Sequence, residues 1–169
     1  YSQGRAAEAE PLYRKALEFR QRVLGEEHPK TADIYNNVAY NLYSQGRAAE
    51  AEPLYRKALE FRQRVLGEEH PKTADIYNNV AYNLYSQGRA AEAEPLYRKA
   101  LEIRQRMLGE EHPKTASSYN NLAAILHTQG RAAEAEPLYR KALEISQRVR
   151  GEEHPGTQNI VNNLAKCKT

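Results

Sequence analysis

Fifteen residues, Gly-Arg-Ala-Ala-Glu-Ala-Glu-Pro-Leu-Tyr-Arg-Lys-Ala-Leu-Glu, run from Gly4 to Glu18 and recur three more times without a change. The copies begin at Gly4, Gly46, Gly88 and Gly130, so each starts 42 residues after the one before it. A fixed period of this size is typical of a stacked array in which one supersecondary unit is repeated. We therefore predict a single array over residues 1–169, with the units 1–42, 43–84, 85–126 and 127–168.

The composition favours helices and excludes several classes of protein. The 25 basic and 22 acidic residues are well mixed, and no basic stripe of the kind that binds nucleic acid occurs. No apolar run approaches the ~18 residues that a membrane-spanning helix needs. Cys167 is the single cysteine, which excludes an internal disulfide and weakly favours a reducing, cytoplasmic location. With no signal peptide and no initiator Met, we expect the chain to start inside a longer parent.

Two helical patterns alternate within each unit, and residues 29–67 contain one complete pair. The first pattern runs from about Pro29 to Ser44, and the second from about Ala48 to Leu66. Gly46 and Gly67 close the two patterns. Apolar residues at three- and four-residue spacing predict one buried stripe on each helix. The stripes are Ile34, Tyr35, Val38, Ala39 and Leu42, then Ala51, Leu54, Tyr55, Ala58, Phe61, Val65 and Leu66.

Pro53 lies inside the second pattern and leaves two starting points for that helix. A proline ring clashes with the carbonyl four residues back, which here belongs to Ala49 in the opening turn. Residues 48–52 are good helix formers or first-turn acids, so we favour a start near Ala48. The alternative is a helix that begins only at Pro53.

The spacing of these residues resembles the tetratricopeptide repeat. Tyr77, Val80, Ala81 and Leu84 match the aromatic, apolar, small and large positions of that family's first helix, and Gly88 matches its turn. Ala93, Tyr97 and Ala100 match its second helix. The usual repeat has about 34 residues; eight more follow Glu102 here, and the long form is similar to the repeats of kinesin light chains. The resemblance implies an all-α, right-handed superhelical α-solenoid of stacked helix-turn-helix repeats, with first helices that line a peptide-binding groove and no catalysis.

A polar stripe on each first helix faces away from its apolar stripe and forms the candidate groove. One Asn in each layer could bond both the donor and the acceptor of an extended peptide backbone. The candidate residues are Asp33, Asn36, Asn37, Tyr40, Asp75, Asn78, Asn79, Tyr82, Asn120, Asn121, Asn162 and Asn163. The stripe also includes Ser44, Ser86, Ser117, Ala124, Thr128, Asn159 and Lys166. The alternative is that these residues are simply solvated. Because basic residues are missing from the first layers, we expect an apolar or mildly basic segment rather than a C-terminal carboxylate.

Other chemistry has little support in the sequence. His28, His70, His112 and His154 each follow two acids, but they lie in separate loops, so helix capping is favoured over metal binding. Cys167 between two lysines could be a modestly reactive thiol, although a role in a terminal cap is favoured. The charged second helices are expected to form a solvated outer face. No phosphate loop or nucleophile–base pair occurs, so we expect no enzyme activity, no metal and no cofactor.

The two ends of the array are expected to be complementary. Residues 1–4 read as the tail of a first helix, and residues 156–168 as a first helix without a second. Such ends favour head-to-tail association, while Lys166, Cys167 and Lys168 add polarity that weakens it. The sequence thus predicts a non-catalytic scaffold that binds a protein or peptide partner. The alternatives are a structural or engineered module that self-associates without a ligand, and a regulatory segment of a larger protein.

Overall fold

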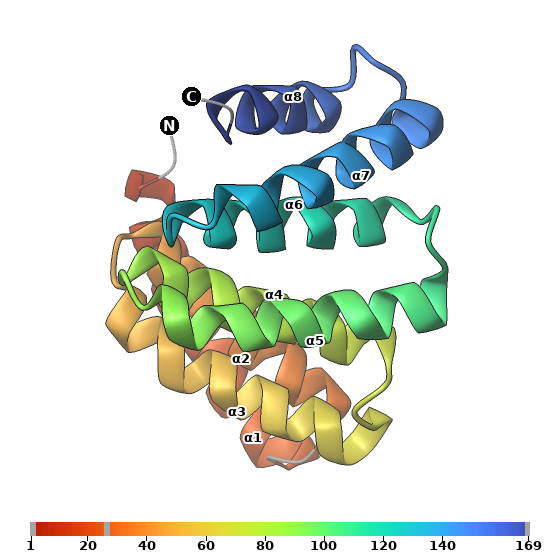
Figure 1. Cartoon of the computed structure of the whole chain (residues 1–169). Helices are drawn as coiled ribbons and strands as arrows, with labels where there is room; N and C mark the ends of the chain where they lie inside the picture. The colour runs from red at the N-terminus through yellow and green to blue at the C-terminus, as the bar shows by residue number, and fades with distance from the viewer. Residues whose placement is uncertain (1–2, 26–27, 168–169) are drawn as a thin grey trace. The chain divides into compact units, whose positions relative to one another are not determined.

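Eight helices make up the described part of the chain in the computed structural model, which covers residues 3–25 and 28–167 (Figure 1). No strand occurs in these residues. The helices are α1 (Gln3–Leu24), α2 (Pro29–Ser44), α3 (Ala48–Leu66), α4 (Pro71–Ser86), α5 (Ala90–Leu108), α6 (Pro113–Thr128), α7 (Ala132–Arg150) and α8 (Pro155–Cys167). The predicted bounds of the first and second helices in residues 29–67 are therefore confirmed.

The chain divides into two compact units, Tyr1–Arg89 and Ala90–Thr169. In the first unit, α2 packs against α1 and α3, and α3 packs against α4. In the second unit, α6 packs against α5 and α7, and α8 packs against α7 and touches α6. Each unit is thus a layered stack in which helices that follow one another in the chain are neighbours in space.

Glycine turns join the first helix of a pair to the second. Gly46 has a φ of 79° and Gly130 a φ of 76°, both in the left-handed region that glycine adopts without strain. The N–H of Arg47 bonds the carbonyl of Leu42 at 3.0 Å, and the N–H of Gly46 bonds that of Tyr43 at 2.9 Å. These bonds satisfy carbonyls that the end of α2 would otherwise leave unpaired.

Each first helix begins with a histidine cap followed by proline. The Nδ1 atoms of His28, His70 and His112 accept the N–H two residues on at 3.1 Å, and that of His154 does so at 3.0 Å. This confirms capping as the role of the repeated histidines. Within the described residues, no group of three or more His, Cys, Asp and Glu side chains is arranged to hold a metal ion.

Two expectations about helix starts have different outcomes. Helix α3 begins at Ala48 and contains Pro53, so the early start is confirmed and the alternative start at Pro53 is wrong. The tail of a first helix expected at residues 1–4 is wrong for Gln3 and Gly4, which belong to α1. Glycine adopts right-handed helical dihedrals as readily as left-handed ones, so Gly4 need not end a helix. Residues 1 and 2 lie outside the described residues.

The core contains the whole first stripe and four residues of the second, in which Leu54 and Leu66 are only half-buried. All five residues of the first stripe are buried, as are Ala51, Tyr55, Ala58 and Phe61 in the second. Val65 is 42% exposed, so its assignment to the core is wrong. The inward line instead passes from Ala58 to Arg62, four residues later, and Arg62 is only 6% exposed. Val65 therefore lies beside the buried line rather than on it.

The second helices are not purely a solvated outer face, as the sequence suggested. The Glu52 side chain in α3 is only 16% exposed and accepts hydrogen bonds from Arg56 at 2.9 Å, Arg89 at 2.6 Å and Gln87 at 3.2 Å. Burial opposes its ionisation, but these three donors together hold the pKa of Glu52 below its ordinary value. The pKa values of the equivalent carboxyls, Glu10 and Glu94, are also lowered. These carboxylates tie one repeat to the turn of the next.

Buried side chains near the ends of first helices also connect successive repeats, through contacts with backbone carbonyl groups. Asn41 donates to the carbonyl of Ala6 at 2.8 Å, and Asn83 donates to that of Ala48 at 2.9 Å. Cys167 occupies the same position in α8, and its Sγ lies 3.6 Å from the carbonyl oxygen of Ala132. Burial, with a contribution from Glu136, raises the pKa of the Cys167 thiol. The thiol is therefore packed within the protein, which supports the predicted structural role over a reactive one.

Candidate functional site

The predicted groove residues lie outside the core, on the face of each first helix opposite its buried stripe. We call this surface the polar face. Tyr40 is 63% exposed, and Tyr82, Asn37 and Asn162 are also exposed. Asp33 is exposed as well. The remaining predicted residues are half-buried; they are Asn36, Asp75, Asn78, Asn79, Asn120, Asn121 and Asn163.

Asparagines of the polar face bond one another between successive first helices. In the first unit, Asn79 on α4 donates to the Oδ1 atom of Asn36 on α2 at 2.9 Å. In the second unit, Asn163 on α8 donates to that of Asn120 on α6 at 3.0 Å. The sequence predicted Asn79 as a peptide contact, but its amide is already engaged with Asn36. The amide group of Asn36 and the carbonyl group of Asn79 form no hydrogen bond with any described residue. The pair therefore offers one donor and one acceptor.

A cavity of about 230 Å³ lies between α2, α3 and α4 in the first unit. Its lining contains two acids and two bases beside three uncharged residues: Asp33, Asp75, Arg62, Lys72, Asn36, Asn79 and Ile76. Arg62 from α3 forms an ion pair with Asp33, so this predicted groove residue is partly engaged within the fold. Sequence reasoning missed Arg62, although arginine recurs 42 residues away at Arg20 and Arg104 on the inward line.

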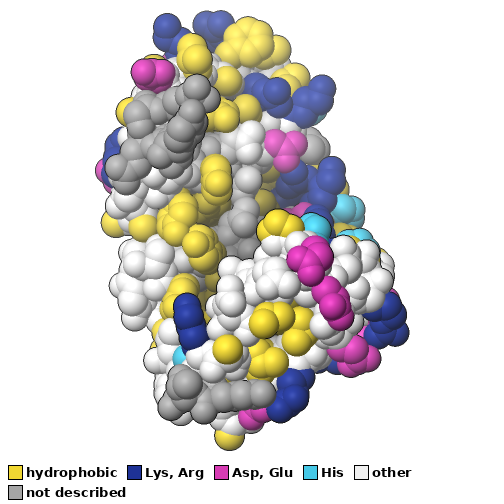
Figure 2. Space-filling model, turned by 90° about the horizontal axis from the view of Figure 1, so that it is seen from above, with side chains coloured by type: hydrophobic (Ala, Val, Ile, Leu, Met, Phe, Trp, Pro, Cys, Tyr) yellow, Lys and Arg dark blue, Asp and Glu magenta, His cyan; other side chains and the backbone are white. Residues whose placement is uncertain are grey.

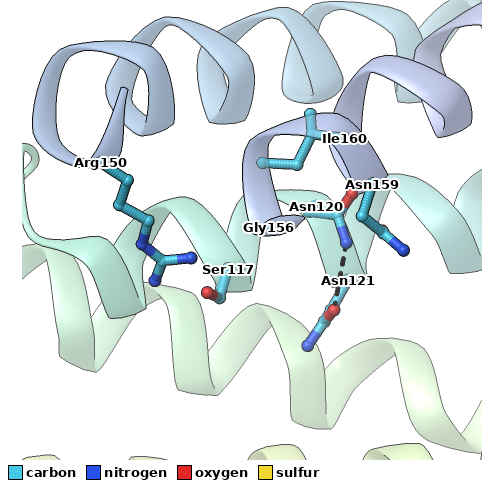
Figure 3. Close-up of a pocket in the computed structure, with 7 residues that line it drawn as sticks. All are labelled: Ser117, Asn120, Asn121, Arg150, Gly156, Asn159 and Ile160. Atoms are coloured by element: carbon cyan, nitrogen blue, oxygen red, sulfur yellow. Dashed lines mark hydrogen bonds between the residues drawn. The ribbon is translucent and has the colours of Figure 1, made fainter. Parts of the chain in front are cut away.

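The equivalent cavity in the second unit lies between α6, α7 and α8 and measures about 190 Å³. Its lining is Ser117, Asn120, Asn121, Arg150, Gly156, Asn159 and Ile160, with Arg150 reaching in from the end of α7 (Figure 3). The Asn120 amide points to the Asn121 side chain at a long 3.4 Å. This cavity holds one cation and no carboxylate, and the sequence did not identify Arg150.

Aromatic side chains distinguish the first unit further. The centroids of the Tyr43 and Tyr82 rings lie 5.2 Å apart, and the ring planes are tilted by 58° to each other. Burial, followed by the neighbouring Tyr82, raises the pKa of Tyr43 to about 12. Beside them, Ser44, Gly46, Ala48 and Ser86 help to line a hollow of about 330 Å³. Ala124 and Lys166 stand in the second unit where the first has Tyr40 and Tyr82.

The molecular surface mixes both signs of charge with apolar side chains. Figure 2 shows Lys and Arg, Asp and Glu, and hydrophobic side chains interspersed on the face that it draws. Within the described part of the chain, no helix is both long enough and apolar enough to cross a lipid bilayer.

Comparison with known proteins identifies the repeat. The tetratricopeptide-repeat family model matches four overlapping segments, residues 1–62, 30–106, 73–145 and 114–169. A search of curated proteins gives no match.

Solved structures share the fold over almost the whole chain. BtubC (BKLC) from P. vanneervenii has a TM-score of 0.86 at 32% identity, over 98% of this chain and 66% of BtubC. This chain thus spans just under two thirds of BtubC.

Two further structures are less similar in sequence. One from Podosopora anserina, described as a kinesin light chain with nearly identical TPR-like repeats, has a TM-score of 0.84 at 24% identity, over 97% of this chain and 77% of that one. The apo form of RapI has a TM-score of 0.83 at 21% identity, over 96% of this chain and 57% of that one. At these identities the likeness shows the fold alone.

The matches confirm the predicted all-α class built from stacked helix-turn-helix repeats. They also confirm the resemblance on which the sequence reasoning relied. With the family model matching all four repeats, the chain belongs to the tetratricopeptide-repeat family.

Proposed function

We propose that this chain is a non-catalytic protein-interaction scaffold that binds extended peptide segments along the polar face of its first helices. The family match supports a protein-interaction repeat scaffold. The observation that carries the finer proposal is the Asn36–Asn79 pair at 2.9 Å, which leaves the Asn36 amide donor and the Asn79 carbonyl acceptor without a hydrogen bond to a described residue. An extended peptide backbone needs one of each.

The surroundings of this pair suit a peptide. Tyr40 and Tyr82 offer exposed rings that add contact area at low entropic cost. The side chains of Asp33 and Asp75 lie at the same cavity and favour a segment that is apolar or mildly basic. Because the carboxylate of Asp33 already pairs with Arg62, the basic preference is expected to be modest.

A random dodecapeptide library displayed on phage tests the proposal with the full chain as bait. Affinities of recovered peptides are then measured by fluorescence anisotropy. The double variant Asn37→Ala with Asn79→Ala should weaken binding at least about tenfold, because two hydrogen bonds of about 1 kcal/mol each are lost. Circular dichroism should show that the variant has the same helical content as the wild-type chain.

Matched controls lie on the second helices of the same unit. Glu18 and Glu60 are exposed on α1 and α3, so Glu18→Ala with Glu60→Ala should leave affinity unchanged. A library that yields no binder, or binders indifferent to Asn37 and Asn79, would reject the peptide-binding face.

A second candidate function, head-to-tail self-association, rests on a separate observation. Leu12 and Phe19 on α1 are 68% and 56% exposed, whereas Phe61, at the position of Phe19 in α3, is 5% exposed. A first helix of another copy could cover this apolar face of α1. Sedimentation velocity should then show concentration-dependent association that Phe19→Gln abolishes. A wild-type chain that stays monomeric up to millimolar concentration would exclude this function.

A further inference from the structure

The last repeat departs from the others at two positions that lie next to each other in space. Arg150 stands where the other repeats have Leu24, Leu66 and Leu108. Gly156 stands where they have Lys30, Lys72 and Lys114. A Cβ atom on Gly156 would lie 2.7 Å from the Nη1 atom of Arg150, closer than such atoms approach. The guanidinium of Arg150 thus occupies space that a side chain at position 156 would enter, so the two departures meet at one place.

The guanidinium is only partly satisfied within the protein. Its Nη2 atom donates to the carbonyl oxygen of Pro113 at 3.2 Å. In the part of the chain that the structure describes, no carboxylate lies within ion-pair distance of Arg150. Arg148, one of its near neighbours on α7, differs in that it pairs with Glu111 at 3.0 Å and Glu144 at 3.2 Å.

The cavity around Arg150 is lined by no acidic residue among those that the structure describes. Where the first unit has Asp33 and Asp75, this cavity has Ser117 and Asn159. A guanidinium that faces neutral hydroxyl and amide groups, and no acid, carries an uncompensated positive charge toward the cavity (Figure 3). Such a group attracts an anion and forms strong charge-assisted hydrogen bonds with it.

We infer that the cavity of Arg150 is a subsite for the carboxylate side chain, Asp or Glu, of a protein segment bound to the second unit. The inference rests on the proposed function, because it assigns the chemistry of one part of the bound segment. One cation matches the single charge of a carboxylate, whereas phosphoryl groups are typically held by arginine clusters. Because the proposed segment runs along the polar face past Asn120 and Asn121, which line the cavity, we assign the carboxylate to a side chain rather than to a chain end.

The test uses nuclear magnetic resonance on the full ¹⁵N-labelled chain at about 150 mM salt, where long-range attraction is screened. The probes are two blocked pentapeptides, acetyl-Gly-Gln-Glu-Gln-Gly-amide and the same peptide with a central Gln. The Glu peptide should move the Nε–Hε signal of Arg150 and the amide signal of Gly156 in a saturable way. The Gln peptide should bind at least about tenfold more weakly, as expected for loss of one charge-assisted contact.

Variants separate a built site from general electrostatics. Arg150→Leu restores the residue of the other repeats, so the fold is retained, and should weaken the Glu peptide about tenfold. Arg148→Leu removes the same charge from a neighbouring position on α7 and should change affinity by less than about twofold. Gly156→Ala keeps the charge but displaces the guanidinium, and should weaken binding by about threefold or more.

Several outcomes overturn the inference. Equal binding of the two peptides, or equal losses in Arg150→Leu and Arg148→Leu, would show that Arg150 is no specific subsite. Binding of the Gln peptide only with a free C-terminus would assign the cavity to a chain end instead. Library peptides that bind through Asn37 and Asn79, with no response of Arg150 to the Glu peptide, would overturn this inference and leave the proposed function intact. A library without binders overturns the proposed function whatever the pentapeptides do.

Discussion

The two cavities between successive first helices occupy equivalent places in their units but differ in charge. In the first unit, two acids face Arg62 and Lys72, and Arg62 is paired with Asp33. In the second unit, Ser146 stands at the position of Arg62 and bonds the buried Thr157 at 2.8 Å. The guanidinium there comes from Arg150, one helical turn later, and meets no acid.

This difference separates the residues that maintain the fold from those that vary on its surface. The alanines at positions 51 and 135 are equally buried in the two units, and the histidine caps have the same geometry. The lining of the cavity, in contrast, changes from charged to mostly neutral. A repeat scaffold can therefore present a different chemical surface in each layer while its packing stays the same. Four predictions test this separation.

The largest expected effect is on the shared core, where the two units should behave alike. Ala51→Leu and Ala135→Leu insert a branched side chain at fully buried positions of α3 and α7. Each should lower the free energy of unfolding by about 1–3 kcal/mol through overpacking. Urea denaturation followed by circular dichroism measures both changes. An unchanged midpoint for either variant would remove that alanine from the close helix contact.

The next effect should appear in the first unit alone. Asp33→Ala leaves the buried guanidinium of Arg62 without its ion-pair partner and should cost about 1–2 kcal/mol, less than a fully buried pair because Asp33 is half-exposed. Ser117→Ala at the equivalent position of the second unit should cost less than about 0.5 kcal/mol. Equal losses in the two variants, measured by the same urea titration, would contradict the difference between the cavities.

Loss of a histidine cap should lower the free energy of unfolding by the same amount in the two units, and by less than the changes above. His70→Ala and His112→Ala each remove a side chain that accepts a backbone N–H at the start of a first helix. Each should cost about 1 kcal/mol, while His70→Asn should keep most of the stability because asparagine also caps helices. Thermal melts of the three variants provide the comparison. A His70→Asn variant as unstable as His70→Ala would indicate that the imidazole has another role.

The smallest effect is a pH dependence that both units should share. The pKa values of Glu52 and Glu94 are lowered in the folded chain, so their contribution is complete above the unfolded carboxyl pKa of about 4.3. Stability should fall as the pH drops below that value through the lower folded pKa. Glu52→Gln or Glu94→Gln should flatten the fall in urea midpoints measured between about pH 5 and pH 3. If neither substitution changes the dependence of the urea midpoint on pH, groups other than these two carboxyls cause the loss of stability in acid.

Much of the fold could be predicted because its signals are local and repeated. The stripe from Ile34 to Leu42 and the glycine turn at Gly46 predicted helices that the structure contains with the same bounds. Arg62 and Val65 were misassigned because both lie at the margin of the apolar stripe, where the neighbouring helix decides which side is covered. The candidate site was predicted less completely. The bond of Asn79 to Asn36 joins residues 43 apart, and no pattern within one helix contains it.

By itself, the sequence determined the period of 42 residues, the helices and most of the buried stripe of each helix in residues 29–67. These follow from hydrophobic spacing and from the dihedral preferences of glycine and proline, which act over a few neighbouring residues. Only the tertiary structure decided which polar groups are engaged inside the protein and which are presented outside. That choice depends on distances between side chains of different helices, as for Arg62 with Asp33 and for Arg150 beside Gly156.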